Sequence, residues 1–170
     1  MLPTLLKRAQ IIGEFPNLRH MAFSLASDPT VEYNCVSWAA GETHRRWWPF
    51  NAYWPPGELR ELTSESFVAA FATLGYEPCA TGEFENDYEK VAIYARAGIP
   101  QHMARQLGDG RWTSKLGSED DIYHDTLAGV EGFRYGTVVQ YLRRQRQGEP
   151  NDQVEDGRTY PMNRSSGFRI

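Results

Sequence analysis

The clearest pattern of apolar and polar positions lies between residues 90 and 142, where short runs alternate in character and are rich in β-forming side chains. Alternation with a period of two is typical of strands. Gly108-Asp109-Gly110 is a strong hairpin turn, because these residues accept positive φ angles. A Gly98-Ile99-Pro100 break separates the two runs before it. The pattern predicts an antiparallel sheet from four strands: Lys90–Ala97, His102–Leu107, Arg111–Leu116 and Tyr135–Leu142.

Helical patterns occur in the first half of the chain. Leu62–Leu74 is the clearest helix, because its apolar positions share one face, Thr63 or Ser64 supplies the N-cap, and Gly75 ends it. Asn34 is a suitable N-cap for a second helix that ends at Gly41. Three further segments are predicted as a helical start with an irregular continuation (1–30), a short strand (Tyr76–Ala80) and a turn of helix (Asp121–Val130).

Helices followed by an antiparallel sheet define the α+β class. We expect one domain over residues 1–143, a length that supports a single hydrophobic core. Residues 144–170 are polar, with scattered Gly and Pro, and too poor in apolar residues to fold alone. They are expected to form a C-terminal tail that is disordered or drapes over the domain through Tyr160, Phe168 and Ile170.

Charge and composition narrow the class of function. The 170 residues are 41% hydrophobic and carry a net charge of −4, which argues against a partner that is duplex nucleic acid. No apolar run is long enough to span a bilayer, and the N-terminus lacks the features of a secretory signal. We therefore expect a cytoplasmic protein with no membrane partner, or else an effector delivered without a classical signal.

Cys35 and His102 are the leading candidates for chemistry. Cys35 falls in the first turn of its predicted helix, where unpaired N–H groups stabilise a thiolate. His102 opens a strand far downstream, and a helix-borne cysteine before a strand-borne histidine is the chain order of papain-like cysteine hydrolases. Ser114, on the adjoining strand, is expected to orient the His102 imidazole through its hydroxyl. The N–H groups at the helix start would stabilise the oxyanion.

Two alternatives stay open at this centre. Cys35 could be a small buried hydrophobic residue, as most free cysteines are. His124, among acidic neighbours, is the rival base. A metal site is not expected, and neither is a cofactor, because Cys35, Cys79, His102 and His124 lack the close pairs of a zinc site.

A loop rich in aromatic residues, RRWWPFNAYWPPG, begins at residue 45, and its prolines exclude regular structure. We expect it to wall a substrate cleft, with Trp47 and Trp48 contacting the substrate together with Asn34 and Trp38, which flank Cys35. Aromatic and arginine side chains also anchor protein interfaces, so the loop is equally a candidate binding surface. A third possibility is that its tryptophans are simply buried.

The hairpin HMARQLGDGRWTS resembles a motif of NlpC-type papain-like amidases, in which a histidine opens a strand and a polar third residue follows twelve positions later. Ser114 occupies that third position, where the family usually has His, Asn or Gln. The segment around Asn34 and Cys35 is similar to the nucleophile helix of that family in its cysteine and its helical context. The resemblance implies a papain-like fold and a cysteine centre of Cys35, His102 and Ser114.

A second resemblance covers about residues 28–143. The combination YNCxxWAAG, HxARQLxDGxWxSKLG and DIxH is similar to a family of uncharacterised bacterial domains, for which it implies no activity. Two functional hypotheses follow from the sequence. One is a cysteine hydrolase or transferase that acts on an amide or ester bond of a peptide, protein or other substrate. The alternative is a catalytically silent papain-like domain that binds a protein partner through residues 45–54.

Overall fold

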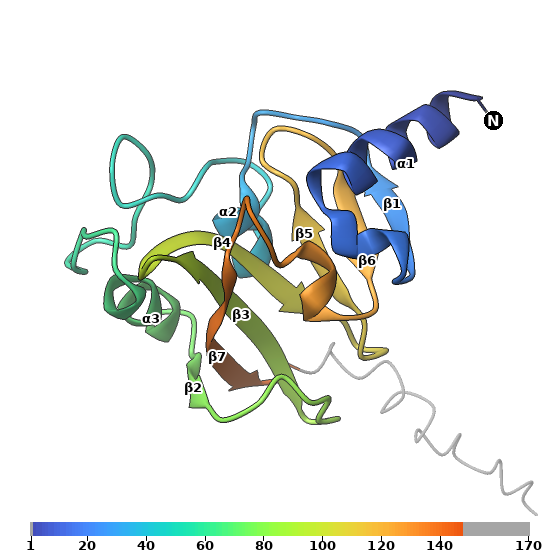
Figure 1. Ribbon diagram of the computed structural model, residues 1–170. Coiled ribbons are helices and arrows are strands. Elements are labelled where there is room, and N and C mark those ends of the chain that lie inside the picture. The colour runs from blue at the N-terminus through green and yellow to red at the C-terminus, as the bar shows by residue number, and fades with distance from the viewer. Residues whose placement is uncertain (1, 148–170) are drawn as a thin grey trace, which may run out of the picture.

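The computed structural model describes residues 2–147, and within them an α+β fold is built on one antiparallel sheet (Figure 1). Seven strands of this described part pair in the order β1-β6-β5-β4-β3-β7-β2. The strands are β1 (Phe23–Ser27), β2 (Glu77–Cys79), β3 (Tyr88–Arg96), β4 (Ile99–Gln106), β5 (Trp112–Lys115), β6 (Asp121–His124) and β7 (Thr137–Gln145).

Helices cover both faces of this sheet. Figure 1 shows α1 near the β1–β6 end and α3 near the β7–β2 end, with α2 beside β4 and β5. The helices are α1 (Leu2–Glu14), α2 (Cys35–Ala40) and α3 (Ser64–Ala72), with short 3-10 turns η1 (Pro16–Arg19) and η2 (Leu127–Val130).

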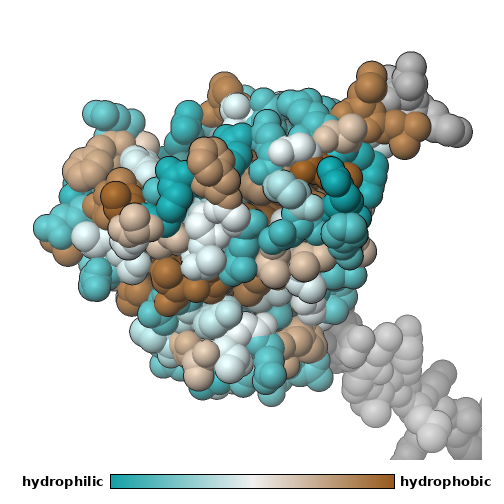
Figure 2. Space-filling view, viewed as in Figure 1, coloured by the Kyte–Doolittle hydropathy of each residue, from teal (hydrophilic) through white to brown (hydrophobic). Residues whose placement is uncertain are grey.

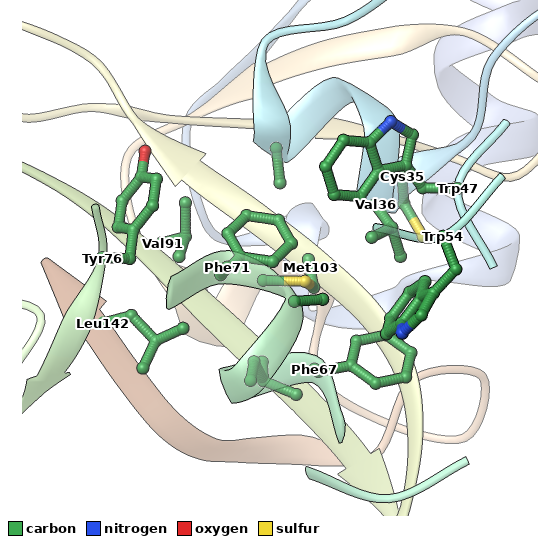
Figure 3. Close-up of a cluster of buried hydrophobic side chains, with 13 residues drawn as sticks. Cys35, Val36, Trp47, Trp54, Phe67, Phe71, Tyr76, Val91, Met103 and Leu142 are labelled. Carbon is green, nitrogen blue, oxygen red and sulfur yellow. The ribbon is translucent and has the colours of Figure 1, made fainter. Parts of the chain in front are cut away.

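The core consists of two apolar clusters separated by the sheet. Central strand β3 supplies both, because its side chains alternate: Val91 and Ile93 face α2 and α3, whereas Ala92 and Tyr94 face α1 and the 3-10 turns. Figure 3 shows the first cluster, in which the aromatic loop and α3 pack over the sheet, with Cys35 at the end where Trp47 and Trp54 lie. A sheet buried on both faces explains why its central strands read as strongly apolar.

The central hairpins confirm the strongest sequence signals. The β4–β5 turn closes with bonds from the Leu107 N–H to the Arg111 carbonyl (2.7 Å) and from the Gly110 N–H to the Leu107 carbonyl (3.0 Å). The N-caps Asn34 and Thr63 are also as predicted. The predicted break between the first two strands is present but shorter: Ala97 and Gly98, both with positive φ, form a tight turn, and β4 already begins at Ile99. His102 therefore lies within β4 and does not open it.

Two further predictions need correction. The segment predicted as a turn of helix divides into strand β6 and the 3-10 turn η2, because Asp121–His124 pairs with both β5 and β1. The irregular continuation predicted after the first helix contains β1, whose partner β6 lies far downstream. Strand β7 runs to Gln145, beyond the predicted domain end at 143. Residues 148–170 of the predicted tail, with Tyr160, Phe168 and Ile170, lie outside the described residues.

The molecular surface is mostly polar, with separate apolar patches (Figure 2). One patch lies at the N-terminal end of α1, where Leu5 and Leu6 are exposed, and another on the lobe of residues 44–62, where Phe50 and Leu59 are exposed. No helix in residues 2–147 combines the length and apolar character needed to cross a bilayer.

Candidate active site

Asn34 fixes the position of Cys35 by joining α2 to the aromatic loop. Its Oδ1 accepts hydrogen bonds from the N–H of Ser37 (3.1 Å) and of Trp47 (3.2 Å), and its Nδ2 donates to the Trp47 carbonyl (2.7 Å). The Ser37 hydroxyl in turn accepts from the Asn34 N–H (2.9 Å), which completes a capping box. Because both its Oδ1 and its Nδ2 bond the backbone, Asn34 holds the start of α2 against the aromatic loop.

A second hydrogen-bond network holds Tyr33, the residue before Asn34. The Tyr33 hydroxyl donates to Asp121 (2.5 Å), a buried carboxylate that also accepts from Ser27 and lies 3.8 Å from the Lys115 ammonium. Lys115 is itself fully buried and donates to the Glu119 carbonyl. Strands β1, β5 and β6 therefore anchor the chain just before α2.

Cys35 lines a cavity of about 580 Å³. Aromatic walls come from Trp48, Phe50 and Tyr135, and Arg46 is the charged side chain among the described lining residues. The remaining lining residues are Asn34, Asn51, Ala52, Gln101, Gly117 and Ser118. Aromatic surface, amides and one cation suit a ligand with an apolar body and a polar or anionic group.

Cys35 is nearly buried, and its environment acts on the thiol in two directions. Burial, the larger effect, raises the pKa of the thiol, and the backbone N–H groups of Met103, Val36 and Cys35 itself oppose this rise. The Arg46 guanidinium also lowers this pKa. The resting side chain is therefore a neutral thiol with thiolate-stabilising groups around it.

His102 lies on β4 and is completely buried. Its ring stacks on Tyr135 with centroids 4.0 Å apart and an interplanar angle of 4°, and Tyr94 packs edge-on at 5.2 Å. The His102 Nε2 is 2.9 Å from the Ser114 hydroxyl, as the sequence hypothesis expects of an orienting residue. The His102 Nδ1 is buried and has no hydrogen-bond partner within the described residues.

Ser114 also contacts the other candidate base. Its hydroxyl is 2.8 Å from the His124 Nε2, and the His124 Nδ1 is 2.8 Å from the Thr126 carbonyl. His102, Ser114, His124 and Thr126 thus form one continuous chain of hydrogen bonds. Burial lowers the pKa of His102 well below its usual value and that of His124 to about 4. Both imidazoles are neutral at neutral pH.

Cys35 packs against one face of the sheet at β4, whereas the His102 ring projects from β4 toward the other face. Cys35 belongs to the cluster that contains Met103, the residue after His102, whereas Tyr94 and Tyr135 around His102 belong to the other cluster. No hydrogen bond between the thiol and the imidazole is present in the described part of the chain. Tyr135 connects the two groups, because it lines the cavity beside Cys35 and its ring covers His102.

The other predicted substrate contacts separate into two groups. Trp48 lines the cavity, as Asn34 does. Trp47 instead lies in the core, 1% exposed, with its indole N–H donating to Glu42 (2.7 Å). Trp38 lies outside the cavity lining, where its indole N–H donates to the Thr113 hydroxyl (3.0 Å).

Sequence reasoning missed Tyr135 and Gln101 as cavity residues and the link from Ser114 to His124. Tyr135 is predicted only as the start of the last strand, and no local pattern indicates that its ring reaches β4. The Ser114–His124 contact depends on strand β6, which the sequence analysis predicts as helical. No group of three or more His, Cys, Asp or Glu side chains within residues 2–147 is arranged to hold a metal ion.

Fold and site together define an α+β protein with a thiol-lined cavity on one side of its sheet and a buried serine–histidine network on the other. Residues 24–143 match a family model described as a domain of unknown function (DUF7689), and the chain belongs to that family. The predicted membership in an uncharacterised domain family, over nearly the same residues, is thereby confirmed. No curated protein and no solved structure matches the chain.

Proposed function

We propose that this protein is a cysteine hydrolase or acyl transferase with a papain-like centre, acting on an amide or ester bond of a peptide, protein or small molecule. The observation that carries the proposal is Cys35, which lines the cavity and whose thiolate form is favoured by the Met103 N–H. His102 precedes Met103 on β4, with its ring on the opposite face of the sheet. The His102 Nδ1 is a buried ring nitrogen with no partner among residues 2–147, while the Nε2 is held by Ser114 on the next strand. This division of the two nitrogens is what a cysteine–histidine centre requires.

The reaction divides into two acyl transfers. In the first, His102 takes the proton of the Cys35 thiol as the sulfur adds to the substrate carbonyl carbon. The tetrahedral intermediate collapses to a thioester, and His102 returns the proton to the leaving amine or alcohol. In the second, water or another acceptor gives its proton to His102 and attacks the thioester, which releases the acyl group and restores the thiol.

The backbone around Cys35 supports such a step electrostatically. The N–H groups of Met103 and Val36 favour the thiolate, and on this proposal they would also donate to the oxyanion that develops beside the sulfur. The thiol and the His102 ring lie on opposite faces of the sheet, so the proposed proton transfer requires that substrate binding rearrange the chain around β4 and Tyr135.

Hydrolysis of a nitrophenyl ester by the full chain tests the proposal. We expect turnover with a burst of nitrophenol and a mass increase on the peptide that contains Cys35. Cys35→Ala should abolish both, while Cys79→Ala, the matched control, should retain them. Equal ester hydrolysis by wild type and Cys35→Ala would overturn the proposal.

One observation favours the alternative, a catalytically silent domain that binds a protein partner. Both the thiol and the imidazoles rest in their neutral forms, and they lie on opposite faces of the sheet. On this alternative the exposed Phe50 and half-buried Trp48 would anchor the partner. Trp48→Ala would then weaken the complex by about 2 kcal/mol, as loss of a buried aromatic anchor does, and Cys35→Ala would leave it unchanged.

A further inference from the structure

The Thr126 carbonyl fixes which atom donates and which accepts in each hydrogen bond of the buried His102–Ser114–His124 chain. The Thr126 carbonyl oxygen can only accept, so the His124 Nδ1, 2.8 Å away, must carry a hydrogen and donate it. His124 is 1% exposed, and burial keeps its ring neutral. A neutral imidazole has one N–H, so the His124 Nε2 is an acceptor.

The same reasoning continues through Ser114. The hydroxyl lies 2.8 Å from the accepting His124 Nε2 and has a single hydrogen, which must point toward His124. Toward His102, 2.9 Å away on the other side, the Ser114 oxygen can then only accept. The His102 Nε2 must therefore carry the hydrogen.

These hydrogen-bond directions also determine whether the other ring nitrogen of His102, Nδ1, carries a hydrogen. Because neutral His102 has its hydrogen on Nε2, its Nδ1 carries a lone pair and is a proton acceptor. This is the buried atom that finds no hydrogen-bond partner in the described part of the chain. A desolvated, unpaired acceptor on a completely buried ring has no evident structural role, and buried polar atoms are normally paired.

We propose that His124 is a positioning residue that, through the Ser114 hydroxyl, holds His102 in the tautomer whose Nδ1 accepts a proton. On this assignment His124 is neither a rival base nor a residue that contacts substrate, and the Thr126 carbonyl sets the direction of the whole chain. Its catalytic meaning rests on the proposed function, since the Nδ1 is the atom that would take the Cys35 proton. The tautomer itself does not depend on any reaction.

Nitrogen NMR of the full chain labelled with ¹⁵N-histidine tests the assignment without a substrate. The four histidines are assigned by single His→Gln variants. We expect the signals of His102 to show hydrogen on Nε2 and none on Nδ1, and those of His124 to show hydrogen on Nδ1. A His102 that carries its hydrogen on Nδ1 in the wild-type protein would overturn the proposal.

Two replacements of His124 separate positioning from packing. In His124→Gln the side-chain amide can donate to the Thr126 carbonyl and accept from Ser114, so His102 should keep its wild-type tautomer. In His124→Leu the Ser114 hydroxyl is free to turn toward His102, and signals of the Nδ1-protonated form should appear. Unchanged His102 signals in a folded His124→Leu variant would contradict the assignment, and the wild-type spectrum decides alone if that variant does not fold.

Failure of the tautomer assignment can be distinguished from failure of the proposed hydrolase function. If the tautomers are as assigned but Cys35→Ala does not impair ester hydrolysis, the positioning chain stands and the hydrolase proposal falls. If hydrolysis depends on Cys35 but His102 carries its hydrogen on Nδ1, the positioning role of His124 falls instead.

Discussion

Asn34 and Ser114 show how single polar side chains connect parts of this site that are distant in the sequence. Asn34 binds the backbone of Trp47 across the start of α2, and Ser114 joins histidines on two different strands. The N-cap role of Asn34 was predictable from local sequence, and so was the approach of Ser114 to His102 across a hairpin. The bond from Asn34 to Trp47 and the contact with His124 were not, because both depend on tertiary packing.

Asn34→Asp should destabilise the protein although it keeps the capping oxygen. The new carboxylate cannot donate to the Trp47 carbonyl, and it places an acceptor against an acceptor in a site that is 8% exposed. We expect a loss of about 1–3 kcal/mol in the free energy of unfolding, the typical cost of an unsatisfied buried group. Urea denaturation measures it. Asn51→Asp, the same change at an exposed cavity residue, should cost less than about 0.5 kcal/mol.

Arg46→Gln should make the Cys35 thiol less reactive. The Arg46 guanidinium lowers the pKa of this thiol, so its removal raises that pKa and reduces the thiolate fraction at a given pH. We expect alkylation of Cys35 by iodoacetamide to slow roughly twofold at pH 8, because the thiolate is the reactive form. Arg45→Gln is the matched control, since Arg45 pairs with Glu42 and stacks on Tyr53. Equal slowing in both variants would count against a direct effect of Arg46.

At the scale of elements, the sequence predicts the helices and hairpins that nearby residues determine, and it misses the strands that form by pairing distant segments. The β4–β5 hairpin, the cap of α2 and the helix α3 each depend on residues within about one turn or one loop of each other. Strands β1 and β6 are short, and β6 is strongly polar, so neither shows a convincing alternating pattern. They are strands because they pair with each other across most of the chain, with Phe23 opposite His124.

The loop before β7 positions Tyr135, and Gly136 allows it to do so. Gly136 has a φ of 73°, and a Cβ at this position would lie 2.0 Å from the Ala95 carbonyl oxygen. Gly136→Ala should therefore shift the loop away from β3 and move the Tyr135 ring from its stack on His102. We expect a loss of stability of at least about 1–3 kcal/mol, from strained backbone and a disrupted contact.

Gly13→Ala provides the control for this change. Gly13 lies in α1, and nothing lies within 4 Å of the position a Cβ would take. Alanine there should stabilise the protein by about 0.5–1 kcal/mol, because it favours the helix. Thermal melting of both variants would show opposite shifts. A Gly136→Ala variant as stable as the wild type would mean that the loop tolerates a different backbone path.

At the scale of the whole molecule, the sheet separates an apolar cluster that contains the thiol from a cluster that surrounds the histidines. The buried polar groups on strands β4, β5 and β6 form two separate networks: two neutral imidazoles joined by a serine, and the Asp121–Lys115 pair. A fold that buries neutral histidines resists their protonation. Its stability must therefore depend on pH, and the direction follows from the pKa shifts.

Lowering the pH from 6.5 to about 4 should destabilise the protein through His124. The folded state holds the pKa of His124 at about 4, below its usual 6.5. In this window the unfolded chain binds a proton that the folded protein does not, so stability falls as the pH falls. The shift corresponds to about 3 kcal/mol, at roughly 1.4 kcal/mol per pKa unit. His102, shifted in the same direction, adds to the loss.

Carboxylates also lose favourable interactions in acid, so the His124→Gln variant is needed to isolate the part of the stability loss that comes from protonation of His124. Glutamine has no proton to gain, so the variant should lose less stability than the wild type between pH 6.5 and 4, whatever its stability at neutral pH. Urea denaturation at several pH values measures both curves. Parallel curves would mean that His124 is protonated in the folded protein throughout this range, and the direction derived for its hydrogen bonds to Ser114 would then be reversed.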